Sequence, residues 1–212
     1  MLELIMSGEP FLFANMFILA FSLALTAQRI HSLWFKFGTS VEDMLRQVLG
    51  FVESGSYARA LQLATAKDHP LNNIFKAALQ RANRSEREIR RAVEATAIAE
   101  LPKIRKGTAF MPQLSNLATL LGLIGTIRGL IISFSGVAGG DAATRQSMLS
   151  QGISIAFYNT YFGLTVAVII IAVYMFILSR QNKIISQMEW GSAQLVDQLL
   201  MKQASGNHKN AA

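Results

Sequence analysis

The sequence predicts an all-α integral membrane protein with three transmembrane helices and long cytoplasmic helical extensions. Half of the 212 residues (51%) are hydrophobic and only 16% are charged, which is typical of a membrane protein. Three apolar runs are long enough to cross a bilayer, and the segments between them have helical spacing. The chain has no cysteine, and its three histidines (His31, His69 and His208) lie far apart. We therefore expect no disulfide, metal site or catalytic histidine cluster.

The first apolar run covers residues 10–30. A signal peptide is the competing interpretation of such a run. However, Glu3 and Glu9 precede it and Arg29 and Lys36 follow it, whereas a signal peptide begins with its positive charges. We therefore expect residues 1–32 to form an N-terminal segment and the first transmembrane helix.

Residues 33–113 are predicted to form a cytoplasmic helical domain. Apolar residues recur at helical spacing from Val41 to Val52, and the pattern stops at Gly55. The segments "YARALQLATAK" and "LNNIFKAALQRA" continue it. The segment "SERE" at 85–88 has the signature of a capping box. The helix that follows should run towards the second span, with kinks at Pro102 and Pro112.

The second and third apolar runs cover about residues 114–137 and 154–178. We expect residues 114–180 to form the core of the membrane region, with a short loop over 138–153. A helical stripe of apolar residues continues after the third run. Residues 181–212 are therefore predicted to form a cytoplasmic C-terminal helix and a flexible tail.

The positive charges orient the chain in the membrane. Fourteen of the twenty Lys and Arg residues lie in 28–113, none lies in 1–9, and 138–153 contains only Arg145. The positive-inside rule then places the N-terminus and the short loop outside, and the large loop and the C-terminus in the cytoplasm. No motif for nucleic-acid binding is present. Five arginines could bind a partner or acidic lipid headgroups, or could form a solvated helix face; they are Arg81, Arg84, Arg87, Arg90 and Arg91.

Two stripes of small residues predict close helix–helix contact in the membrane. The second span carries Ala118, Gly122, Thr126, Gly129, Ser133 and Gly136, with Gly125 beside them. The third span carries Gly152, Ala156, Thr160, Gly163 and Ala167. A chain with three spans has few internal partners, so part of this surface should meet neighbouring copies or another protein.

The two threonines in these stripes allow two interpretations. Their hydroxyls could bond to their own helix backbone and serve packing alone, or they could face a narrow polar path. The second interpretation is favoured by the polar residues Tyr158, Asn159 and Tyr161 beside Thr160. Each of these polar groups needs a partner within the hydrocarbon layer.

The apolar spans contain no carboxylate. No Asp or Glu occurs in residues 101–140 or 142–188, although proton transport normally uses an ionisable carrier within the membrane. If this chain conducts protons, a second protein must supply the acid. Arg128 is the only charged residue inside the second run. It could snorkel to the outer surface or pair with an acidic group of a partner.

The motifs "LATLLGLIGTIRGLIISF" and "QGISIAFYNTYFGLTVAVII", with "ELPKIRKG" upstream, resemble the MotA/TolQ/ExbB proton-channel family. Three spans are more similar to the TolQ and ExbB branch than to the four-span MotA branch. Two positions depart from the family pattern. Ile155 stands where many members carry Glu, and Arg128 stands where an aromatic residue is frequent.

The resemblance implies a ring, a homopentamer around two copies of a single-span partner similar to ExbD or TolR, which carries the membrane Asp. It implies a stator subunit of a motor in the bacterial inner membrane, with no cofactor. An enzyme is not expected, because the sequence has no nucleophile–base constellation or phosphate loop. Protons are the expected coupling ion and sodium is the alternative. The pore threonines of the family fall on Thr126 and Thr160. The rival function is a non-conducting oligomeric scaffold that anchors cytoplasmic partners.

Overall fold

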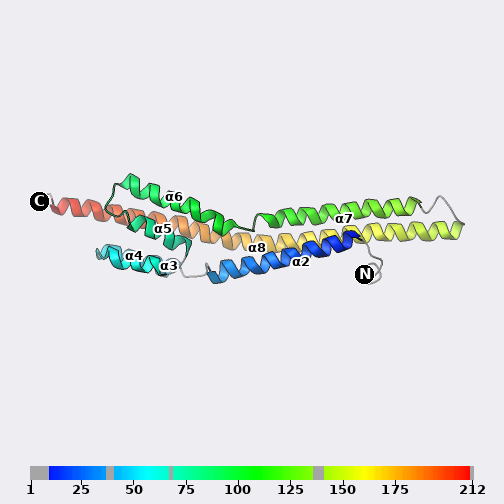
Figure 1. Ribbon diagram of the computed structural model, residues 1–212, viewed down its shortest axis with the longest axis horizontal. Coiled ribbons are helices and arrows are strands. Elements are labelled where there is room, and N and C mark those ends of the chain that lie inside the picture. Colours follow the sequence, from blue (N-terminus) through cyan, green and yellow to red (C-terminus); the bar gives the residue numbers. More distant parts are fainter. Residues whose placement is uncertain (1–9, 37–40, 67–68, 136–140, 211–212) are drawn as a thin grey trace. The chain divides into compact units, whose positions relative to one another are not determined.

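The computed structural model describes residues 10–36, 41–66, 69–135 and 141–210 (Figure 1), and the elements within these ranges are all helical. They are α2 (Pro10–Ile30), a π-helix η1 (His31–Lys36), α3 (Val41–Glu53), α4 (Tyr57–Thr65), α5 (Pro70–Leu79), α6 (Glu86–Arg105), α7 (Phe110–Ser135) and α8 (Ala142–Asn210). The predicted all-α class is confirmed. Among these residues, three helical stretches are long and apolar enough to cross a membrane, namely Pro10–Trp34, Glu86–Ser135 and Ala142–Ser205.

The chain divides into two compact units. The membrane unit contains residues up to Arg29 and from Gly107 to Leu178, and so holds nearly all of α2, all of α7 and the first half of α8. The second unit contains Ile30–Lys106 and the chain from Ser179 onwards. It holds η1, α3 to α6 and the second half of α8.

Large apolar side chains form the core of the second unit. Phe75 of α5 is fully buried, and η1, α6 and α8 also contribute large side chains that are fully buried. The largest fully buried side chains of this unit are Leu33, Leu71, Ile74, Phe75, Ile89, Ile104, Ile184, Leu195 and Leu199. Burial of such side chains from water stabilises each by roughly 1.5–3 kcal/mol, so this unit is held together as a water-soluble helical domain is.

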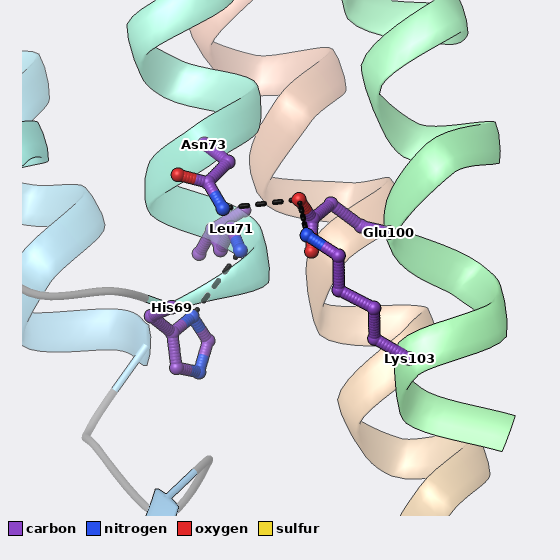
Figure 2. A network of polar contacts seen from close by, with 5 residues as sticks. All are labelled: His69, Leu71, Asn73, Glu100 and Lys103. Atoms are coloured by element: carbon purple, nitrogen blue, oxygen red, sulfur yellow. Dashed lines mark hydrogen bonds and ion pairs between the residues drawn. The ribbon is translucent and has the colours of Figure 1, made fainter. Parts of the chain in front are cut away.

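Polar contacts join α5 to α6 at one side of this core (Figure 2). The imidazole Nδ1 of His69 accepts a hydrogen bond from the Leu71 backbone N–H at 3.2 Å and so caps the start of α5. The buried carboxylate of Glu100 accepts a hydrogen bond from Asn73 Nδ2 at 3.0 Å and pairs with Lys103 Nζ at 2.6 Å. Glu100 is thus paired and hydrogen-bonded, as a buried charge must be.

The predicted capping box is present at the start of α6. The Glu88 carboxylate accepts hydrogen bonds from the Ser85 hydroxyl at 3.0 Å and from the Ser85 backbone N–H at 3.2 Å. These bonds favour the ionised acid and lower the pKa of Glu88 from its ordinary value. The five predicted arginines around this cap are all exposed.

A break before α7 adds to the sequence expectation, which placed kinks at Pro102 and Pro112. Both prolines lie within helices, and the chain leaves the helix at Lys106 and resumes at Phe110. Gly107 has a φ of +82°, a left-handed conformation that glycine adopts without strain and that commonly ends a helix. The signal for the break is therefore the glycine after the basic last turn of α6.

The short loop expected over 138–153 is largely helical. The third apolar run was expected to begin near residue 154, but α8 begins at Ala142. The Asp141 carboxylate accepts a hydrogen bond from the Thr144 backbone N–H at 2.9 Å. An aspartate in this position starts a helix by satisfying a backbone donor of the first turn.

Candidate functional site

The backbones of α7 and α8 meet directly in the membrane unit. A Cβ atom built on Gly129 would lie 2.6 Å from the Ala156 backbone nitrogen, and one built on Gly163 would lie 2.8 Å from the Ala118 carbonyl oxygen. These pairings run in opposite directions along the two helices, so α7 and α8 are antiparallel (Figure 1). Such an approach requires small residues at the contact.

All six residues predicted to pack helices are buried at this contact, which we call the α7–α8 seam. They are Gly122, Gly125, Gly129 and Ser133 of α7 with Ala156 and Gly163 of α8. The Ser133 hydroxyl donates a hydrogen bond to the Leu149 carbonyl oxygen at 3.2 Å. Gly136, which the sequence stripe included, lies outside the described residues.

Thr126 and Thr160 meet at the middle of the seam, and their hydroxyl groups are in direct contact. The Thr126 hydroxyl lies 3.1 Å from the Gly122 carbonyl oxygen of its own helix and 3.3 Å from the Ala156 carbonyl oxygen across the seam. Both side chains are half-buried. The Thr126 hydroxyl thus bonds its own helix backbone, as the packing interpretation expects, and also contacts the second hydroxyl. The polar path stays a prediction.

Asn159 lies in the seam on α8 and is fully buried. Its Nδ2 donates to the Ile155 carbonyl oxygen at 3.0 Å, and its Oδ1 has no hydrogen-bond partner among the described residues. A Cβ on Gly125 would lie 2.5 Å from the Asn159 Cγ. The amide therefore occupies the space that any side chain at position 125 would need.

The two candidate tyrosines lie on a more exposed face of α8. Tyr158 and Tyr161 are 44% and 61% exposed on α8, so they face the surroundings of the membrane unit. Arg128 is half-buried on α7. The structure thus brings Thr126, Thr160 and Asn159 together at the seam and leaves the two tyrosines on an outer surface.

Two polar contacts of the membrane unit were not predicted. The Ser115 hydroxyl donates to the Ala167 carbonyl oxygen at 3.0 Å, and a signal for this was present, since Ser115 continues the small stripe one turn before Ala118. The buried Arg29 of α2 donates from Nε to the Thr108 hydroxyl at 3.1 Å. No sequence pattern pointed to that pair.

The seam offers hydroxyl and carbonyl oxygens but no acid. Neither 101–140 nor 142–188 contains Asp or Glu, and a guanidinium does not release its proton at ordinary pH. The hydroxyl groups of the seam can donate hydrogen bonds to a proton-carrying group or accept hydrogen bonds from it, and the carbonyl oxygens can accept them. It supplies no carboxylate to carry that proton itself.

The chain is similar to proteins of known family. Residues 66–190 match the MotA/TolQ/ExbB proton channel family. An ExbB homologue described as a biopolymer transport protein, from Methanothermobacter thermautotrophicus, is 30% identical over 203 residues, which cover 91% of this chain and 70% of that protein. The ExbB-like protein 3 of Synechocystis is 32% identical over 155 residues, covering 71% and 73% of the two chains. The solved structure of MotAB from C. jejuni is similar with a TM-score of 0.49 and 12% identity, covering 91% of this chain and 79% of that one.

Proposed function

This chain belongs to the MotA/TolQ/ExbB proton channel family, and from that premise we propose that it is the stator and channel subunit of a motor driven by the proton-motive force. Five copies form a ring around two copies of a single-span partner similar to ExbD or TolR. Ion flow through this complex is coupled to mechanical work on the cell envelope or on a motility or transport apparatus.

The observation that carries this proposal is the hydroxyl pair in a membrane seam without carboxylates. Thr126 and Thr160 are in contact and half-buried, and the apolar spans hold no Asp or Glu. An aspartate on the partner's span would supply the missing proton carrier, and the two hydroxyls would bond it as it loads and releases a proton. The proposed additional contacts with the partner or the path are Arg128, Tyr158, Asn159 and Tyr161.

The proposed setting is the cytoplasmic membrane, with the N-terminus outside and the C-terminus inside. The charge distribution supports this orientation, because fourteen of the twenty basic residues lie in 28–113. Protons are the proposed coupling ion. Replacing external sodium with potassium should leave activity unchanged, whereas loss of activity would favour sodium.

The test is proton flux into liposomes that contain the chain together with its partner. Thr160→Val replaces threonine with a side chain of similar size that lacks the hydroxyl. The proton flux should fall by about tenfold or more, because a hydrogen bond to a charged group contributes about 1.5–3 kcal/mol. Thr165→Val is the matched control. The Thr165 hydroxyl is on the same helix and donates to the Tyr161 carbonyl oxygen of its own backbone at 2.8 Å.

Equal flux in wild type and Thr160→Val would remove Thr160 from the mechanism. A single-span protein with one membrane Asp should also co-purify with the chain, and the mass of that complex would measure the copy number. Absence of any such companion from an active preparation would refute the proposed channel.

A non-conducting scaffold is the second candidate function. The observation that favours it is that the Thr126 hydroxyl already has carbonyl oxygens of its own chain as hydrogen-bond partners. A threonine that serves helix packing alone needs no further partner. A scaffold would keep its cellular role after collapse of the membrane potential. The proposed motor would lose that role at once.

A further inference from the structure

Arg180 and Trp34 meet where two apolar segments of the chain end. Trp34 belongs to η1, directly after α2, and Arg180 follows the apolar run of α8 that ends at Leu178. Both residues lie in the second unit. The guanidinium carbon of Arg180 lies 5.6 Å from the centroid of the Trp34 ring, within the range of a cation–π contact. The π-helical turn that carries Trp34 is a rare form, often found at functional sites.

The charge of Arg180 is not balanced by a carboxylate. Over the ranges that the structure describes, Arg180 makes no ion pair or hydrogen bond, and its buried Nε has no partner. The sequence offers no nearby acid in either segment, because residues 10–41 and 142–188 contain neither Asp nor Glu. Lys183, exposed one turn further along α8, adds a second positive charge.

A cation–π contact is made through the face of a guanidinium, whereas its N–H donors form an edge in the plane of the group. The contact of Arg180 with Trp34 therefore does not use that edge for hydrogen bonds. That edge suits the oxygens of a phosphate group, which arginine binds through two parallel hydrogen bonds. Tryptophan is enriched at the level of lipid headgroups, which are the densest source of phosphate at the end of a transmembrane segment.

We propose that Trp34 and Arg180 form a binding site for the headgroup phosphate of an anionic phospholipid. The site rests on the membrane location of the chain and does not depend on ion conduction. A phosphate bound there would satisfy Arg180 and tie the ends of two apolar segments to the bilayer surface.

The first experiment measures which lipids stay with the protein. The full chain is stripped of lipid in detergent and exchanged into mixed vesicles of phosphatidylglycerol and phosphatidylethanolamine. It is then re-extracted, and its bound headgroups are quantified. Arg180→Gln should lower retained phosphatidylglycerol about fivefold, the expected contribution of one basic side chain at an anionic surface. Retained phosphatidylethanolamine should not change.

Arg59→Gln is the matched control, because Arg59 is an exposed arginine of α4 and is not one of the five arginines that could bind lipid headgroups. It should keep the wild-type level of phosphatidylglycerol. Trp34→Leu should show a partial loss, since it removes the stacking surface and keeps the charge. Wild-type retention in Arg180→Gln, or equal loss in both arginine variants, would overturn the proposed site.

The second experiment keeps Arg180 intact and so does not depend on the folding of the arginine variant. In a Trp190→Phe protein, Trp34 is the only tryptophan. Its fluorescence should shift when phosphatidylglycerol vesicles are added and should stay constant with vesicles of phosphatidylethanolamine alone. A shift with inorganic phosphate at constant ionic strength but none with lipid would overturn the lipid assignment in favour of free phosphate.

Discussion

The two halves of α8 are packed by opposite means. In the membrane unit, Gly152, Ala156 and Gly163 bring the backbone of α8 against α7. In the second unit, Ile184, Leu195 and Leu199 of the same helix are buried as large apolar side chains. One continuous helix from Ala142 to Asn210 therefore changes its packing chemistry part of the way along.

The solvent around each half explains the difference. In water, burying a large apolar side chain is favourable in itself. In a bilayer the lipid tails are equally apolar, so helices associate through close backbone contact and hydrogen bonds. The membrane unit should therefore be sensitive to added atoms, and the second unit to removed ones.

The largest expected effect is the removal of a core side chain from the second unit. Phe75→Ala should cost about 3–5 kcal/mol of unfolding free energy, because the fully buried ring leaves a cavity. Denaturant unfolding followed by circular dichroism measures it. Ile98→Ala on α6, where the side chain is 63% exposed, should be close to neutral. Similar losses for both variants would contradict a specifically packed core.

Adding one methyl group to the seam should have the next largest effect. Gly129→Ala forces a Cβ against the Ala156 backbone nitrogen, which cannot move without separating the helices. We expect a loss of about 1–3 kcal/mol, measured as reduced thermal stability in detergent. The control is Gly191→Ala in the second unit, where a Cβ would lie 3.4 Å from Leu71 Cδ1, an ordinary contact. Equal destabilisation by the two substitutions would remove the proposed contrast between the halves of α8.

A Cβ atom at position 125 would also clash across the seam, but with a side chain that a second substitution can shorten. Gly125→Ala collides with the Asn159 side chain, whereas Gly129→Ala meets backbone. The single variant should be destabilised by about 1 kcal/mol or more, and adding Asn159→Ala should restore most of that loss. A double-mutant cycle in thermal stability measures the coupling. Additive losses would mean that Asn159 does not occupy the space beside Gly125.

The smallest expected effect concerns the exposed cap of α6. The pKa of Glu88 is lowered mainly by its hydrogen bond from the Ser85 hydroxyl, so the ionised acid stabilises the folded state. This contribution is complete above the ordinary carboxyl pKa and is lost as pH falls through the lower folded value. Amide exchange at Ser85, corrected for its intrinsic pH dependence, should lose protection by about two- to fivefold in that acidic window. Glu88→Ala should remove this pH dependence; an unchanged profile would show that the cap does not form.

Much of the fold could be read from the sequence because apolar length and small-residue spacing are strong signals. The first span coincides with its apolar run, and Thr126 and Thr160 meet as members of two stripes. The break at Gly107 and the early start of α8 after Asp141 depend on single residues at helix ends, where apolar periodicity carries no information. The pairing of Arg29 with Thr108 joins residues 79 positions apart, and only the packed structure brings them together.

The close backbone contact in the α7–α8 seam also determines which positions can carry a spectroscopic probe. The chain has no cysteine, so a single introduced thiol would carry a unique label. A label at Gly129 would force the helices apart, whereas Ile127 and Phe157 are 53% and 72% exposed and can accept one. Spin labels at Ile127 in the proposed ring would report distances between copies, and the number of distinct distances together with their ratio would give its symmetry.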